Sequence, residues 1–198
     1  MKKIIFNDKY GLTRAVLEGR KTQTRRIAYT GNATIIDCGI CVEPKNIGRA
    51  TLFRGIDEIA HSRYCIGKEV AVAQAYCELV SEAGYNEEEI NKLRCSKGWT
   101  NKMYVKADLM PHRIRITDIR AERLQEISDE DCIAEGIKKY PEVNKNMWGF
   151  FNIKGATLKY ELSTTSREAY AKLIDHISGK GTWASNPYVF VYEFEMID

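Results

Sequence analysis

A basic segment near the start of the chain carries the side chains best suited to chemistry. Residues 19–26 read Gly-Arg-Lys-Thr-Gln-Thr-Arg-Arg, and the only acid between Arg14 and Arg26 is Glu18. The whole chain has 30 Lys and Arg against 27 Asp and Glu, so average composition does not explain this local excess. Cations this close repel one another unless water or an anion screens them. The segment is a candidate site for a phosphate or a polar nucleobase, and the alternative is a solvated basic strand edge.

Two residues of this segment, Lys21 and Thr24, are candidates for activated chemistry. We expect the neighbouring arginines to lower the pKa of Lys21, so that its neutral amine can act as a base or nucleophile. A threonine hydroxyl nearby is a group that this amine can activate. Residues three apart point to opposite faces of a regular strand, so both reach one pocket only if the chain turns or bulges between them. The alternative is a phosphate- or solvent-contacting Lys21 beside a Thr24 that only favours the strand.

Glu135 is the third candidate, at the end of a helix that Ser128 is expected to begin. Ser128 and Asp131 form a pattern like a capping box, and Gly136 indicates where the helix ends. The exposed carbonyls of a last turn disfavour an anion, which favours the protonated carboxyl used in general acid–base catalysis. The alternative is a solvated glutamate near a helix end.

The composition predicts one globular domain. The 198 residues are 44% hydrophobic and 29% charged, and a net charge of +3 is too small for a protein that coats nucleic acid along its length. No apolar run has the length of a membrane span or a signal peptide, so we expect a cytoplasmic protein with no membrane partner. The sequence does not determine the oligomeric state.

Metal and cofactor motifs are scarce. Cys38 and Cys41 form a lone C-x-x-C without the second ligand pair that a zinc site usually has, so we expect no metal and six reduced cysteines. The motifs of nucleoside triphosphatases, dinucleotide enzymes and zinc proteases are missing, and we expect no cofactor.

Hydrophobic periodicity predicts several short strands around a few helices. The clearest strand covers residues 113–120, where Ile114 and Ile116 alternate with Arg113 and Arg115. Other strands are expected at residues 3–6, 21–27, 70–76, 103–106 and 188–195, and helices at residues 13–18, 86–94, 128–135 and 166–177. We expect a single α+β domain over residues 1–198, a small β-barrel with flanking helices, and insertions near residues 28–62, 78–102 and 140–162.

Taken together, five segments resemble the ASCH domain, a branch of the PUA-like superfamily, in its longer phage-type members. They are Gly19–Arg26, Arg63–Val70, Ile116–Leu124, Ser128–Gly136 and Trp183–Phe194. The resemblance implies a barrel of five to six strands with a cleft between barrel and helix, and a domain that binds RNA or acts in nucleic-acid metabolism. Some small ASCH members are amidohydrolases of cytidine acylated at its exocyclic nitrogen. Their Lys–Thr–Glu set falls on Lys21 as base, Thr24 as nucleophile and Glu135 as acid–base partner.

Three functional hypotheses follow. The first is a module that binds RNA or another nucleic acid and recognises a base in a basic cleft, with phosphate contacts from Arg14, Arg20, Arg25, Arg26 and Arg113. The second is an amidohydrolase of acylated cytidine or a related modified nucleoside. The third is a protein-interaction module of a mobile element, with exposed aromatic residues at 148–151 (Trp-Gly-Phe-Phe) as its docking patch.

Overall fold

The structure is a computed structural model that describes residues 1–28, 41–42, 51–54, 57–80, 85–154 and 157–197. For residues 41–42, 51–54, 57–59 and 154 only the backbone is described. The fold is mixed α+β, as predicted, with strands and helices interleaved along the chain.

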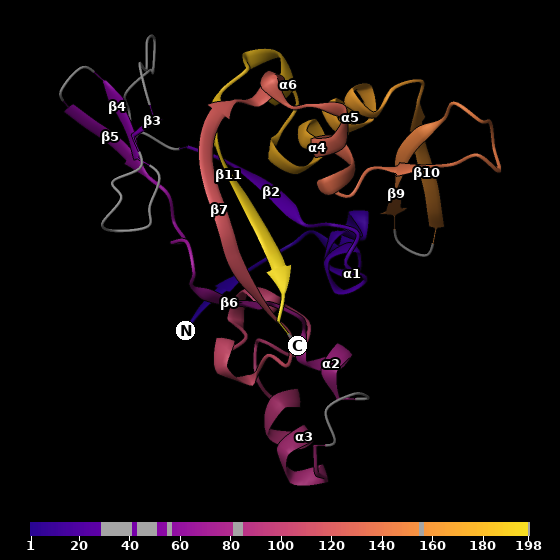
Figure 1. The fold of residues 1–198 in the computed structure, drawn as a ribbon. Coiled ribbons are helices and arrows are strands. Elements are labelled where there is room, and N and C mark those ends of the chain that lie inside the picture. The colour runs from indigo at the N-terminus through magenta and orange to yellow at the C-terminus, as the bar shows by residue number, and fades with distance from the viewer. Residues whose placement is uncertain (29–40, 43–50, 55–56, 81–84, 155–156, 198) are drawn as a thin grey trace.

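A five-stranded sheet forms the centre of the molecule (Figure 1). Its spatial order is β1 (Lys2–Ile4), β6 (Glu69–Val72), β7 (Arg113–Arg123), β11 (Tyr188–Met196) and β2 (Gln23–Ile27). The first pair is parallel and the other three are antiparallel. Among the described strands β1 and β2 are the two edges and do not pair, so the sheet is open where the sequence predicts a closed barrel.

Alternating side chains explain why β7 lies at the middle of this sheet. Ile114 and Ile116 are fully buried, while Arg115 between them is exposed. The pleat turns successive side chains to opposite faces, so one face of β7 joins the core and the other meets solvent. The predicted strand and its orientation are therefore confirmed.

Helices pack on the apolar face of the sheet. They are α1 (Leu12–Leu17), α4 (Asp129–Ala134), α5 (Ser166–Ser178) and the short α6 (Thr182–Ser185), with the 3-10 turns η1 (Asp8–Tyr10) and η4 (Leu124–Glu126). The main core joins Val16 of α1, Tyr170 and Leu173 of α5, and Val191 of β11, all almost fully buried. This packing fixes the helix ends against the sheet, which is where the candidate site lies.

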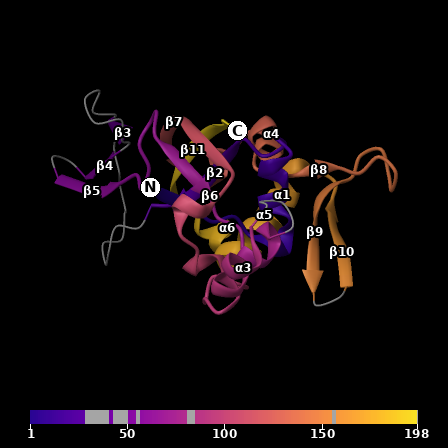
Figure 2. The same ribbon diagram turned by 90° about the horizontal axis from the view of Figure 1, so that it is seen from below.

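Three further segments project from the central sheet (Figures 1 and 2). One is a three-stranded sheet of β3 (Cys41–Val42), β4 (Thr51–Arg54) and β5 (Asp57–His61). The second contains α2 (Tyr76–Leu79), α3 (Glu87–Arg94), η2 (Lys102–Tyr104) and η3 (Ala107–Leu109). The third is a sheet of β8 (Lys138–Lys139), β9 (Trp148–Lys154) and β10 (Thr157–Ser163). They fall where insertions are expected, and residues 29–40, 43–50, 55–56, 81–84 and 155–156 of those stretches lie outside the described residues.

The strand expected at residues 103–106 is wrong. Its first two residues belong to the 3-10 turn η2, where the Asn101 side chain accepts a hydrogen bond from the Met103 amide and the Asn101 carbonyl accepts one from the Tyr104 amide. These local bonds satisfy the backbone without a sheet partner.

In the part of the chain that the structure describes, no helix combines the length and the apolar character needed to cross a membrane.

Candidate functional site

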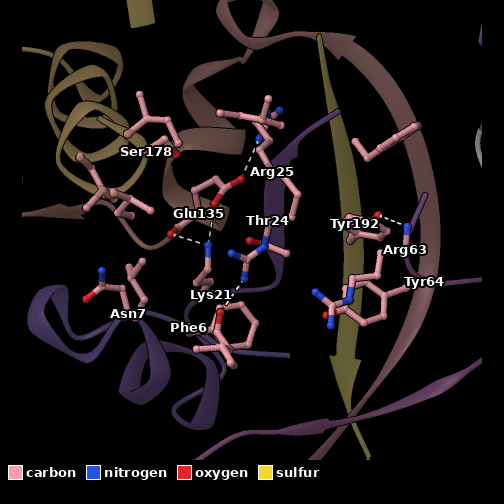
Figure 3. Close-up of a pocket in the computed structure, with 18 of the residues that line it drawn as sticks. Phe6, Asn7, Lys21, Thr24, Arg25, Arg63, Tyr64, Glu135, Ser178 and Tyr192 are labelled. Carbon is pink, nitrogen blue, oxygen red and sulfur yellow. Dashed lines mark hydrogen bonds and ion pairs between the residues drawn. The ribbon is translucent and has the colours of Figure 1, made fainter. Parts of the chain in front are cut away.

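A cavity of about 950 Å³ lies between the central sheet and α5. Its walls come from β2, β11 and α5, from the segment after β1, and from the end of α4. Lys21, Thr24, Arg25 and Glu135 line one side, and Arg63, Tyr64 and Tyr192 line another (Figure 3). The three predicted catalytic residues therefore share one cavity, although Glu135 is 114 positions from Lys21 in the sequence.

Lys21 lies in the turn between α1 and β2. Its amide, like that of Arg20, donates to the Ala15 carbonyl, and Gly19 supplies the left-handed conformation (φ 70°) that lets the chain reverse after the helix. The side chain is buried, and its Nζ donates to the Gln23 carbonyl (2.8 Å), the Glu135 carbonyl (2.8 Å) and Glu135 Oε2 (2.6 Å). All three protons of an ammonium are thus placed on acceptors.

Glu135 is the C-cap residue of α4. Its amide donates to Asp131, and the next residue, Gly136, has φ 104°, a conformation that side chains rarely adopt and that ends the helix. Glu135 presents both its carbonyl and its carboxylate to Lys21, so a cation occupies the negative end of the helix. The expected helix end at Glu135 is confirmed, and the residue is buried, not solvated.

Burial lowers the pKa of Lys21. Glu135 opposes this shift, while Arg26 and Arg25 add to it. The predicted direction is confirmed, but its main cause is loss of water and not the neighbouring arginines. A lysine in this setting reaches its neutral form more readily than one in water.

Thr24 belongs to β2 and pairs with Tyr192 of β11. The predicted conflict with strand alternation does not arise, because Lys21 precedes the strand and is not part of it. Thr24 is buried from bulk water and lines the cavity (Figure 3). Within the described part of the chain its hydroxyl makes no hydrogen bond, so this group is available to a ligand.

Arg25 supports the site from behind. Its Nη2 lies 2.6 Å from both Glu122 and Asp131, and its Nη1 lies 2.6 Å from the Gln23 side chain and 3.4 Å from Glu135 Oε1. Burial opposes its charge, but Glu135 and Glu122 raise the pKa of Arg25. Arg25 therefore remains a cation and holds the Glu135 carboxylate from the side opposite Lys21.

The arginines predicted to contact nucleic acid do not form one surface. Arg14 and Arg20 both pair with Glu18, at 2.7 and 2.6 Å, and line a separate hollow of about 280 Å³. Arg113 lies on β7, with Nη1 3.8 Å from Glu69. Of these five arginines, Arg25 and Arg26 line the main cavity, and the side chain of Arg25 is fully buried.

Sequence periodicity misses the residues at the other side of the cavity. The Arg63 amide donates to the Tyr192 hydroxyl at 2.8 Å, and the rings of Tyr64 and Tyr192 meet edge to face at 5.2 Å (Figure 3). The signal available in the sequence is the segment Arg63–Val70, which is one of the segments that resemble ASCH domains.

A further prediction concerns a metal site. In the described ranges, no three His, Cys, Asp or Glu residues are grouped to hold a metal ion, and Cys38 and the side chain of Cys41 lie outside those ranges.

The proposed aromatic docking patch is wrong in part, because Phe150 is only 2% exposed. Its ring packs edge to face on Tyr10, which makes it part of the core.

Comparison with protein-family models, curated proteins and solved structures found no match to this chain. The resemblance to ASCH domains therefore stays a prediction from the sequence motifs.

Proposed function

We propose that this chain is an amidohydrolase of the ASCH type, which removes the acyl group from cytidine acylated at its exocyclic nitrogen or from a related modified nucleoside. One observation carries the proposal: Lys21, Thr24 and Glu135 line the same cavity, with Lys21 Nζ 2.6 Å from Glu135 Oε2. A nucleophile, a base and an acid in reach of one bound amide are what acyl transfer requires.

The fold assignment is part of the same proposal. We assign the chain to the PUA-like superfamily, although the described strands form an open five-stranded sheet and not a closed barrel. Its support is the cavity between the sheet and the helices, the position that the resemblance implies for a ligand cleft.

In the first step, the Lys21–Glu135 pair accepts the proton of the nucleophile and donates the proton that the leaving group needs. A proton moves from the Lys21 ammonium to the Glu135 carboxylate, which leaves a neutral amine beside a neutral acid. The amine takes the hydroxyl proton of Thr24 as its oxygen attacks the amide carbon. When the carbon–nitrogen bond breaks, the Glu135 acid protonates the leaving amino group. The products are an ester on Thr24 and free cytidine, and the pair returns to ammonium and carboxylate.

The second step regenerates the enzyme. Glu135, now a carboxylate, takes a proton from a water molecule that attacks the ester carbon. The ester bond to Thr24 breaks, and the proton passes from Glu135 to the threonine oxygen. The acyl group leaves as a carboxylic acid, which ionises in solvent. The charges that form in each transfer are stabilised by groups already in place, such as Arg25 beside Glu135.

The arrangement of the arginines supports hydrolysis better than it supports binding along an RNA strand. An RNA surface needs several cations on one accessible face. Here Arg14, Arg20 and Arg113 lie beside carboxylates away from the cavity, and Arg25 is enclosed by acids.

The test is hydrolysis of a panel of N4-acylated cytidines, followed by the change in ultraviolet absorbance. Wild type is compared with Lys21→Met, Glu135→Gln and the control Arg115→Gln, which alters an exposed arginine of β7 outside the cavity. We expect turnover by wild type and the control, and a loss of at least about a hundredfold in the other two. No turnover at high enzyme concentration refutes the proposal and makes RNA binding the function to test next.

A further inference from the structure

The two ends of the cavity differ in how their cations are neutralised. At the inner end, Lys21 and Arg25 both contact carboxylates. At the end formed by Arg63, Arg26 and Lys3, no carboxylate from the described part of the chain pairs with any of the three cations. Figure 3 shows Arg63 across the cavity from Glu135, beside Tyr64 and Tyr192.

The Arg63 guanidinium keeps its hydrogen-bond donors unused within the described part of the chain. The guanidinium carbon of Arg63 lies 5.8 Å from the centre of the Tyr64 ring, and its side chain donates no hydrogen bond to any other residue that the structure describes. Its backbone is fixed on both sides, because the amide donates to Tyr192 and the carbonyl accepts from Lys2 Nζ. Beside the Tyr64 ring, the exposed guanidinium of Arg63 thus lines the cavity with no hydrogen-bond acceptor among the described residues.

Lys3 adds positive potential at the same place, and the charge of Arg26 acts both on Tyr64 there and on Lys21 at the inner end. Arg26 donates from Nη2 to the Ile5 carbonyl at 2.7 Å, and Lys3 Nζ donates to the carbonyls of Met103 and Val105 at 2.7 and 2.6 Å. These acceptors orient the cations but carry no full charge. Burial and then the charge of Arg63 lower the pKa of Lys3, so the two cations repel each other. An anion between them relieves this repulsion.

The geometry points to a phosphate subsite: we propose that Arg63, assisted by Arg26 and Lys3, binds a phosphate group of the ligand, so that the ligand is a nucleotide and not an uncharged nucleoside. A guanidinium matches the oxygens of a phosphate with two parallel hydrogen bonds. The inference rests on the proposed function for the position of the base, beside Lys21 and Thr24. A cavity of about 950 Å³ has room for base, sugar and phosphate together. The phosphate belongs either to a mononucleotide or to the backbone of a short RNA.

The test measures binding without turnover, by calorimetry with cytidine, with cytidine monophosphate, and with a short cytidine oligonucleotide that lacks terminal phosphates. We expect wild type to bind a phosphate-bearing ligand at least about tenfold more tightly than cytidine, the effect of one strong charge-assisted contact. Arg63→Gln removes this preference and leaves the affinity for cytidine within about twofold. Arg63→Lys keeps part of the preference, and the control Arg115→Gln keeps all of it.

The measurements with cytidine monophosphate and with the oligonucleotide distinguish the two sources of phosphate. Preference for the monophosphate assigns a free nucleotide, and preference for the oligonucleotide alone assigns an RNA backbone. Equal affinity for cytidine and both phosphate-bearing ligands, or no binding of either phosphate-bearing ligand, overturns the inference. So does a preference that persists in Arg63→Gln. A phosphate preference in a protein that does not hydrolyse acylated cytidine overturns the proposed activity and leaves the phosphate subsite in place.

Discussion

The Lys21 ammonium lies 2.6 Å from the Glu135 carboxylate and 2.8 Å from the carbonyl of the same residue. Glu135, at the end of α4, thus neutralises the charge of Lys21 and accepts two of its hydrogen bonds. A buried ion pair adds little to stability by itself, because both ions lose their water. Its value in the proposed mechanism is that a proton moves between the two groups inside the cavity that Thr24 also lines.

The pair predicts a strong coupling between two substitutions. Lys21→Met leaves the Glu135 carboxylate with only Arg25 at 3.4 Å, and Glu135→Gln leaves a buried ammonium without its counterion. We expect each single variant to lower the free energy of unfolding by about 2–4 kcal/mol. The double variant should lose at least about 1 kcal/mol less than the sum of the two. Urea unfolding of the four proteins measures this difference, and additive losses would mean that the two groups do not interact.

The lowered pKa of Lys21 predicts a dependence of stability on alkaline pH. In the folded protein, burial brings this pKa below its ordinary 10.5. Between the lowered value and 10.5 the unfolded chain holds a proton that the folded chain has released, so the free energy of unfolding rises with pH. Below that window the full cost of burying the ammonium is present.

Comparison with Lys21→Met isolates this effect, because other titrating groups are shared. From neutral pH towards 10.5, the stability of wild type should improve relative to the variant, measured by urea unfolding at each pH. A constant difference, or a shift in favour of the variant, contradicts the assigned direction.

The sequence predicts local structure well where one pattern dominates. Alternation places β7 correctly, and the Ser128 and Gly136 signals place both ends of α4. For α5, which the sequence predicts at residues 166–177, Thr165 is the N-cap, while the Ser166 hydroxyl bonds to Asp129. Local patterns do not distinguish these two hydroxyls.

The candidate site is only partly predictable, since it depends on contacts between distant segments. No periodicity predicts the contact of Lys21 with Glu135, and the motif resemblance names both residues without showing that they meet. Arg63 is missed because its proposed role depends on having no carboxylate partner among the described residues, which appears only when the sheet and its neighbours are assembled. The hairpin of β9 and β10 is missed because its strands carry no clean alternation, although Phe150 packs in the core.

Substitution of Phe150 tests whether the hairpin of β9 and β10 packs on the core. Phe150 is 2% exposed and contacts Tyr10, whereas Tyr160 on the paired strand is 54% exposed. Phe150→Ala should lower the free energy of unfolding by about 3–5 kcal/mol through the cavity that it leaves. Tyr160→Ala should change it by no more than about 0.5–1 kcal/mol. Thermal unfolding of both variants checks this, and equal effects would show that β9 does not pack on the core.

The hydroxyl of Thr24 gives the most direct test of the proposed mechanism. The measurement is kcat/KM for N4-acylated cytidine in wild type, Thr24→Ser and Thr24→Val. Serine keeps the hydroxyl, and valine keeps the shape and β-branching without it. All three proteins are first compared by thermal unfolding, so that a loss of activity is not mistaken for a loss of fold.

We predict that Thr24→Ser retains measurable turnover, and that Thr24→Val loses at least about a thousandfold while still folding. Turnover by Thr24→Val close to that of wild type would contradict the account, because the hydroxyl would then take no part in breaking the amide bond.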